Sequence, residues 1–169
     1  MSETAEPVGL HPCARCAAVQ KTCCQRAEIF VTTGDVARIR KHSGSDGFYG
    51  HRAPVDPAYA EPDPDDPEWP QRTVRADGMR RVLNRRPGGD CAFLGAFGCV
   101  LPLDVRPLVC RLYPFEYTAG GIVGVASDYC PTRLLAPAGQ PMTAVLGMSA
   151  VEAEGWRRQL YQEIRDGAP

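Results

Sequence analysis

The sequence predicts a small single α+β domain, built from short strands or hairpins and two or three helices. Three observations support this prediction. The chain has 169 residues, with 44% hydrophobic and 23% charged residues, which is ordinary for one globular domain. Short β-prone runs alternate with two segments that carry helix-capping signals. Eight cysteines fall into an early and a late group, and a domain of this length does not need them merely to fold.

The early cysteine group is the segment around which we expect the domain to be organised. Cys13 and Cys16 form a C-x-x-C pair, which places two sulfurs on one tight turn at little cost in loop-closure entropy. Cys23 and Cys24 follow closely enough to complete a metal site, and in an extended chain their side chains would point to opposite sides. The alternative is a disulfide framework, which the even total of cysteines also allows.

The choice between metal and disulfides depends on the compartment. The first residues contain neither a basic region nor the apolar run of a signal peptide, and no apolar stretch approaches the length of a membrane span. We therefore expect a cytoplasmic protein outside the membrane, where thiols stay reduced, and we favour a metal site over disulfides. A formal net charge of −1 lacks the basic excess of a nucleic-acid-binding protein, so we expect no nucleic-acid partner.

The segment after the early cysteines predicts a buried strand followed by a helix. Residues 29–31 are a short apolar, β-prone run. Thr32 and Asp35 then fit a capping box, in which two side chains satisfy the first free backbone amides of a helix. Val36 and Ile39 mark the buried side of this helix, and we expect the following Ser-Gly pair to end it.

Residues 54–70 separate the two cysteine groups and contain six prolines and six acidic residues. Such a composition favours extended, solvated chain, so we expect a disordered insertion here. Several arginines follow, around an Asp77-Gly78 pair that suggests a hairpin turn. We favour a solvated hairpin that partly pairs with the acidic insertion over an anion-binding strand pair, because no aromatic residues alternate with the arginines.

The late cysteine group combines a predicted hairpin with a short helix. Cys91 and Cys99 flank a glycine-containing turn, across which a metal could be held. Cys110 lies between two prolines that suit the start and the end of a short helix. Arg106 and Arg111 flank this cysteine, where they would lower its pKa and donate hydrogen bonds to sulfur, in a shell outside the metal ligands. The alternative is that both arginines cap carbonyls or face water.

The remainder of the chain predicts a glycine-led strand at 120–126, the last cysteine at Cys130, and a C-terminal helix. Ser149 and Glu152 fit a second capping box at the start of that helix. An apolar stripe with helical spacing follows, formed by Trp156, Leu160 and Ile164. We therefore divide the chain into a cysteine-rich domain over 10–135 and a linker and packing helix over 136–169.

With both groups described, the chain resembles the YkgJ-type cysteine-cluster family of zinc- or iron-chelating proteins, which includes flagellin lysine N-methylase. The resemblance rests on C-x-x-C followed by Cys-Cys, on Asp90-Cys91-x-Phe-Leu, and on Arg106-Pro-x-x-Cys110-Arg-x-Tyr-Pro. Together these motifs cover most of residues 13–131. The resemblance implies that all eight cysteines bind metal, namely Cys13, Cys16, Cys23, Cys24, Cys91, Cys99, Cys110 and Cys130.

The spacing does not fix the metal. Structural zinc sites often use two C-x-x-C hooks and only one is present, whereas iron-sulfur clusters tolerate scattered cysteines, so we favour iron or an iron-sulfur cluster, with zinc as the alternative. The first functional hypothesis is a metal-chelating protein, with a structural or redox-active metal and a protein partner or substrate. The resemblance also allows a protein-lysine N-methyltransferase. A thiol redox or metal-transfer protein, with Cys23 and Cys24 exposed, is the third hypothesis.

Overall fold

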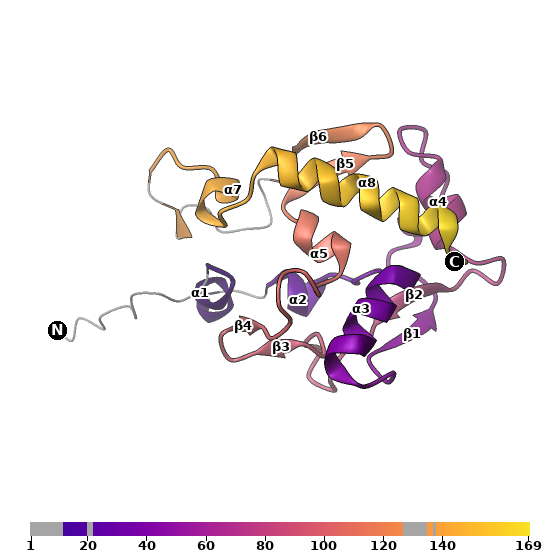
Figure 1. Ribbon diagram of the computed structural model, residues 1–169, viewed down its shortest axis with the longest axis horizontal. Coiled ribbons are helices and arrows are strands. Elements are labelled where there is room, and N and C mark those ends of the chain that lie inside the picture. Colours follow the sequence, from indigo (N-terminus) through magenta and orange to yellow (C-terminus); the bar gives the residue numbers. More distant parts are fainter. Residues whose placement is uncertain (1–11, 20–21, 127–134, 137) are drawn as a thin grey trace.

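The computed structural model describes residues 12–19, 22–126, 135–136 and 138–169, and these form a mixed arrangement of helices and short strand pairs (Figure 1). The α+β prediction is therefore confirmed. The helices are α1 (Pro12–Val19), α2 (Cys23–Arg26), α3 (Thr33–Ser43), the 3-10 turn η1 (Pro57–Ala60), α4 (Glu68–Thr73), α5 (Leu108–Leu112), α7 (Met142–Val145) and α8 (Ala150–Asp166). In the described part of the chain, no helix is both long enough and apolar enough to cross a bilayer.

The strands pair as antiparallel two-stranded sheets in the described residues. The pairs are β1 (Tyr49–Arg52) with β2 (Arg80–Leu83), β3 (Leu94–Gly95) with β4 (Gly98–Cys99), and β5 (Phe115–Thr118) with β6 (Gly121–Val125). The last two pairs are hairpins; their glycines predict the first of them and strand β6, whereas strand β5 is not predicted. The first pair joins strands far apart in the sequence, which no local turn signal could reveal.

Helix α3 begins and ends as the capping signals predict. The Thr32 hydroxyl accepts a hydrogen bond from the Asp35 backbone N–H at 2.9 Å, and the Asp35 carboxylate accepts one from the Thr32 N–H at 3.0 Å. Gly44 ends the helix with φ of 68°, a left-handed conformation that glycine adopts without steric cost. Val36 and Ile39 face the core as expected.

Residues 29–31 are buried and extended, but they make only a single bridge, between Phe30 and Val82 of β2. The Val31 N–H donates to the Arg81 carbonyl at 3.1 Å, and the Leu83 N–H donates to the Ile29 carbonyl at 2.9 Å. The run stops at this length because the next residue already caps α3. Its alternating side chains enter two different parts of the core, since neighbours in extended chain point to opposite sides.

The core has two main clusters. The first lies beneath α3 and contains Ile29, Val31, Val36, Ile39, Phe48, Leu83, Cys91 and Leu101. The second lies beneath α8 and contains Phe30, Leu108, Leu112, Phe115, Ala153, Leu160, Tyr161 and Ile164. Helix α8 contacts α5, β6, α3 and α4, so the C-terminal helix supplies much of the second cluster, as its apolar stripe predicts (Figure 1).

The structure differs from the disordered insertion that we expect over 54–70. Most of residues 55–65 are exposed, but the segment contains η1 and the start of α4. Asp66 is only 5% exposed and accepts a hydrogen bond from the Tyr161 hydroxyl. The Trp69 ring lies 5.6 Å from Phe30 and 6.1 Å from Tyr161, between ring centroids. These few residues anchor the segment on α8 despite its composition.

The arginines after this segment do not form the predicted solvated hairpin. Asp77 and Gly78 make a turn, but β2 pairs with β1 instead of with the chain just before the turn. Arg80 is 1% exposed, forms an ion pair with Glu28 at 3.3 Å, and places its guanidinium 4.1 Å from the centre of the Tyr59 ring. The prediction fails for Arg80 and Arg81, which are buried on the strand that pairs with β1, whereas Arg72 and Arg75 are exposed.

Candidate metal centre

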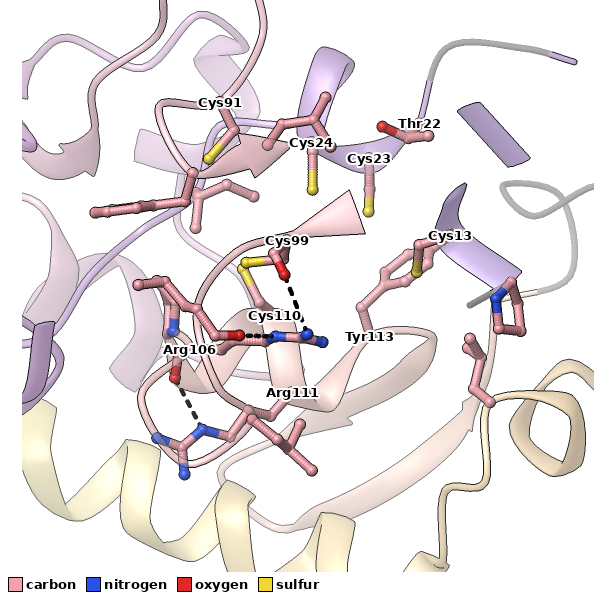
Figure 2. A pocket seen from close by; sticks show the side chains of 18 of the residues that line it. Cys13, Thr22, Cys23, Cys24, Cys91, Cys99, Arg106, Cys110, Arg111 and Tyr113 are labelled. Carbon is pink, nitrogen blue, oxygen red and sulfur yellow. Dashed lines mark hydrogen bonds between the residues drawn. The ribbon is translucent and has the colours of Figure 1, made fainter. Parts of the chain in front are cut away.

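A cavity of about 440 Å³ lies between α1, α2, the β3–β4 hairpin, α5 and the start of α8. Every cysteine that the structure describes lines this cavity: Cys13, Cys16, Cys23, Cys24, Cys91, Cys99 and Cys110. Figure 2 shows the sulfurs of the early and the late groups facing one another across it. The remaining predicted ligand, Cys130, lies outside the described residues. The two cysteine groups therefore meet in space over the described part of the chain.

Helix α2 places two of these thiols side by side. Its first turn is closed by the Thr22 N–H, which donates to the Gln25 side-chain oxygen at 2.9 Å. In an extended chain Cys23 and Cys24 would point to opposite sides, but neighbours in a helix are separated by only about 100°. Both sulfurs consequently face the cavity (Figure 2).

Backbone and side-chain hydrogen bonds fasten the early group to the late group. The Cys91 N–H donates to the Cys24 carbonyl at 2.8 Å. The Gln25 side-chain amide donates to Asp90 at 3.0 Å, so the residue after Cys24 is also joined to the residue before Cys91. Arg85 donates to the carbonyls of Cys24 at 3.3 Å and Gly89 at 2.6 Å. These contacts hold Cys24 and Cys91 at the same wall of the cavity.

The sequence interpretation missed Arg85 and Gln25 as residues that build the site. Arg85 belongs to the arginine run that we assign to a solvated hairpin. The signal that could have identified it is its position two residues before the Pro-Gly-Gly turn that leads into Cys91.

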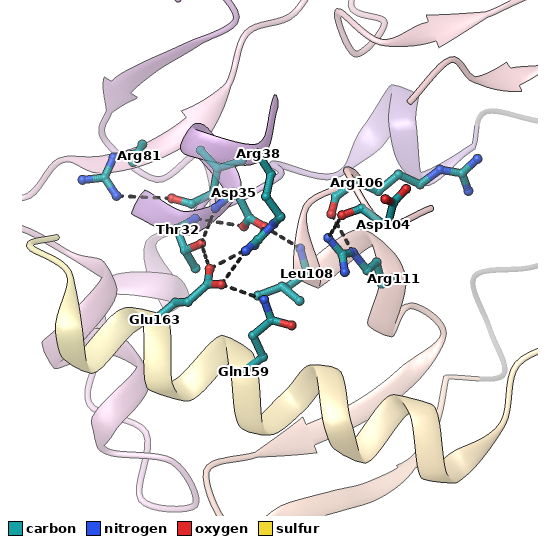
Figure 3. A network of polar contacts seen from close by, with 11 residues as sticks. Thr32, Asp35, Arg38, Arg81, Asp104, Arg106, Leu108, Arg111, Gln159 and Glu163 are labelled. Carbon is teal, nitrogen blue, oxygen red and sulfur yellow. Dashed lines mark hydrogen bonds and ion pairs between the residues drawn. The ribbon is translucent and has the colours of Figure 1, made fainter. Parts of the chain in front are cut away.

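Helix α5 is positioned by a buried carboxylate on α3. The Asp35 side chain, which is 0% exposed, accepts a hydrogen bond from the Leu108 N–H at 3.1 Å (Figure 3). The same carboxylate pairs with Arg38 at 2.6 Å, and Arg38 also pairs with Glu163 of α8 at 2.6 Å. The network therefore fixes the helix that carries Cys110 against both α3 and α8.

The two arginines that flank Cys110 differ in their contacts. Arg106 donates to the Leu101 carbonyl at 2.9 Å and to the Cys99 carbonyl at 3.5 Å, and its charge lowers the pKa of the Cys24 thiol. Arg111 donates to the carbonyls of Arg106 at 2.8 Å and Asp104 at 2.6 Å (Figure 3). Both arginines thus cap carbonyls, but the charge of Arg106 also acts on Cys24 and Cys99. The pKa of Cys110 is raised, contrary to the lowering that we expect from the sequence.

Cys24 is the thiol most easily ionised among those with a shifted pKa. A hydrogen bond with the Cys23 side chain lowers the pKa of Cys24 to about 7, against the effect of burial and with help from Arg106 and Arg85. The same hydrogen bond raises the pKa of Cys23. The pair therefore shares one readily lost proton.

The other thiols of the late group hold their protons more tightly. Burial raises the pKa of Cys91 to about 11 and also raises the pKa values of Cys99 and Cys110. Negative charge on neighbouring cysteines adds to these shifts. A metal bound by these residues would displace their protons and offset the repulsion between the resulting thiolates.

The donor set fits a soft metal in kind. Thiolates select zinc, copper(I) and iron-sulfur clusters, in contrast to the oxygen ligands of magnesium or calcium. Four sulfurs around one zinc ion lie 2.3 Å from the metal and therefore about 3.8 Å from one another. Within residues 12–19, 22–126, 135–136 and 138–169, no three Cys, His, Asp or Glu side chains converge closely enough to hold one ion. The cavity thus offers suitable ligands at a spacing wider than a single ion requires.

We compared the chain with protein-family models, with curated proteins and with solved structures, and none of the three comparisons found a match.

Proposed function

We propose that this chain is a cysteine-ligated metal-binding protein of the YkgJ type. One observation carries the proposal: all seven described cysteines, from segments far apart in the sequence, line the same cavity. Buried cysteines with a purely packing role behave as small apolar side chains and have no reason to gather at one place. Gathering them costs electrostatic free energy as soon as they ionise, and a bound metal offsets that cost.

A disulfide framework is less consistent with this arrangement. No disulfide joins any two of the seven described cysteines. A domain of 169 residues with two apolar clusters also has a sufficient core without such links.

The origin of the cysteines in several separate segments of the chain favours an iron-sulfur cluster over a single zinc ion. A cluster spreads its cysteine ligands over several iron atoms, so the sulfurs stay farther apart than around one ion. The guanidinium of Arg106 and the apolar side chains of Leu101 and Leu103 at the cavity wall would limit water access and tune the potential of such a centre. Once bound, a cluster of this kind would supply one-electron redox chemistry.

Thiol-based metal transfer is a second candidate function, favoured by the lowered pKa of Cys24 beside a neighbouring thiol. Mapping of alkylated residues in the metal-loaded protein separates the two candidates. Modification of Cys23 and Cys24 alone would favour transfer, whereas protection of all the cavity cysteines would favour a closed centre.

The proposal is tested by anaerobic purification followed by metal and acid-labile sulfide analysis of one sample, with its visible absorption spectrum. We expect coloured protein containing iron and sulfide. Colourless protein with zinc would keep the metal-binding proposal but replace the cluster with zinc. Metal-free protein that already contains disulfides after purification without air would overturn the proposal.

A further inference from the structure

We propose that the cavity cysteines form two sets that bind metal in order. The core thiol set is Cys24, Cys91, Cys99 and Cys110, and the α1 thiol set is Cys13, Cys16 and Cys23. The core thiol set forms the first site, and the α1 thiol set closes over it and forms a second site. This division rests on the proposed function and adds the number and order of the sites.

Packing separates the two sets. Cys91 is part of the buried cluster beneath α3, and the other three members of the core thiol set pack against that same cluster. Cys16 instead belongs to a separate small cluster with Leu135 and Met142. The members of the core thiol set are therefore placed by the main core of the domain, and Cys16 is placed by residues near the C-terminal linker.

Hydrogen bonds also fix the core thiol set without any metal. Cys24 and Cys91 are joined through the backbone at 2.8 Å, and Arg85 bonds the Cys24 carbonyl. Cys99 lies on β4, where it pairs with Leu94 and its carbonyl faces Arg106. The helix of Cys110 is held by the Asp35 carboxylate, as described above. Each of these four thiols thus sits on an element with its own attachment to the fold.

Charge favours the same division. Arg85 and Arg106 donate hydrogen bonds to carbonyls of two cysteines in the core thiol set, at 3.3 Å and 3.5 Å. These bonds to the backbone hold both guanidinium groups beside the set, where their charge would offset part of the negative charge that four thiolates bring to a metal. A set that is already placed and partly charge-compensated loses less entropy on binding, so it binds metal first.

The α1 thiol set is carried differently. Helix α1 has eight residues and packs against β4, where a Cβ atom added at Gly98 would lie 4.0 Å from the Cβ of Cys13. Arg15 of α1 donates to the Leu135 carbonyl at 3.4 Å. Cys23 lies on α2 next to Cys24 but is assigned to the α1 thiol set, because it lies on the side of Cys13 in Figure 2. Metal bound by the α1 thiol set would fasten α1 to α2 over the first site.

Stepwise reconstitution of the wild-type protein tests the order. Reduced, metal-free protein receives iron and sulfide in substoichiometric steps without oxygen, and each step is alkylated with iodoacetamide and mapped by mass spectrometry. We expect the core thiol set to become protected together in the first steps, while Cys13 and Cys16 remain reactive until later additions. Protection of Cys13 and Cys16 in parallel with Cys91 and Cys110 from the first step would overturn the division.

Two double variants provide the matched comparison. We expect the double variant Cys13→Ser with Cys16→Ser to keep more than half of the wild-type iron, and Cys91→Ser with Cys110→Ser to lose nearly all of it. Equal losses would overturn the division while leaving the proposed function intact, whereas wild-type protein that takes up no metal would overturn both. Because the second variant removes buried side chains, the wild-type labelling decides the result if that variant does not fold.

Discussion

Replacement of Asp35 by alanine tests whether one buried carboxylate joins α3 to the helix that carries Cys110. Asp35→Ala removes the acceptor of the Thr32 N–H at the start of α3, a capping interaction worth about 1 kcal/mol. It also leaves the buried Leu108 N–H without its acceptor, which costs about 1–3 kcal/mol. Arg38 keeps its second partner, Glu163, so the loss of the ion pair between Arg38 and Asp35 adds little to this cost. We expect the free energy of unfolding to fall by about 3 kcal/mol.

The assay is urea denaturation of the reduced, metal-free protein at pH 7, followed by far-ultraviolet circular dichroism, so that bound metal does not contribute. Asp46→Ala is the matched control, because Asp46 also pairs with an arginine of α3 but its side chain is 70% exposed. We expect no resolvable change in that variant. A fall below about 1 kcal/mol for Asp35→Ala would refute the inference that this carboxylate holds the two helices together.

Three further predictions concern ionisation and the acidic segment. Alkylation of Cys24 in the metal-free protein should show a midpoint near pH 7, because the hydrogen bond with the neighbouring cysteine lowers its pKa to about 7; a midpoint above pH 8.5, the ordinary value for cysteine, would contradict this. Burial opposes ionisation of Glu163, but hydrogen bonds from three side chains outweigh it and lower the pKa. Its stabilising contribution is therefore complete above its ordinary pKa of about 4.3 and is lost progressively as the pH falls from there through the lowered value. Urea denaturation of Glu163→Gln should therefore show a deficit against wild type at pH 6 that narrows at pH 3.5, and an unchanged deficit would argue against this sign. Tyr161→Phe should speed tryptic cleavage at Arg72, because Asp66 loses its hydroxyl donor; cleavage at the wild-type rate would mean that the contact does not anchor the segment.

The elements that the sequence predicts well are those whose signals are local. Helices α3 and α8 follow from capping residues and apolar spacing within a few turns. The β3–β4 hairpin, strand β6 and α5 follow from glycine and proline positions in the same way. Each of these signals acts over a short stretch of chain, so distant contacts do not overrule it.

The predictions that fail concern contacts between distant segments. Pairing of β1 with β2 depends on residues 49–52 and 80–83 meeting, and no turn between them signals it. The composition of residues 54–70 predicts solvated chain, yet Asp66 and Trp69 contact Tyr161 of α8 and anchor the segment there. The average composition of a segment cannot reveal that two of its residues pack against a distant helix.

The candidate site was predictable as a set of residues but not as a geometry. The cysteine motifs predict which side chains gather, and the structure brings all of the described ones to one cavity. Their division between two packing clusters, and the contacts of Arg85 with Cys24, arise from tertiary packing that spacing does not encode.

The most direct test of the central claim is X-ray absorption spectroscopy at the metal edge of the anaerobically purified protein. The account predicts a first coordination shell of sulfur alone, at about 2.3 Å, with metal-metal scattering from a cluster. A first shell of oxygen or nitrogen would contradict the claim that the cavity cysteines are the ligands.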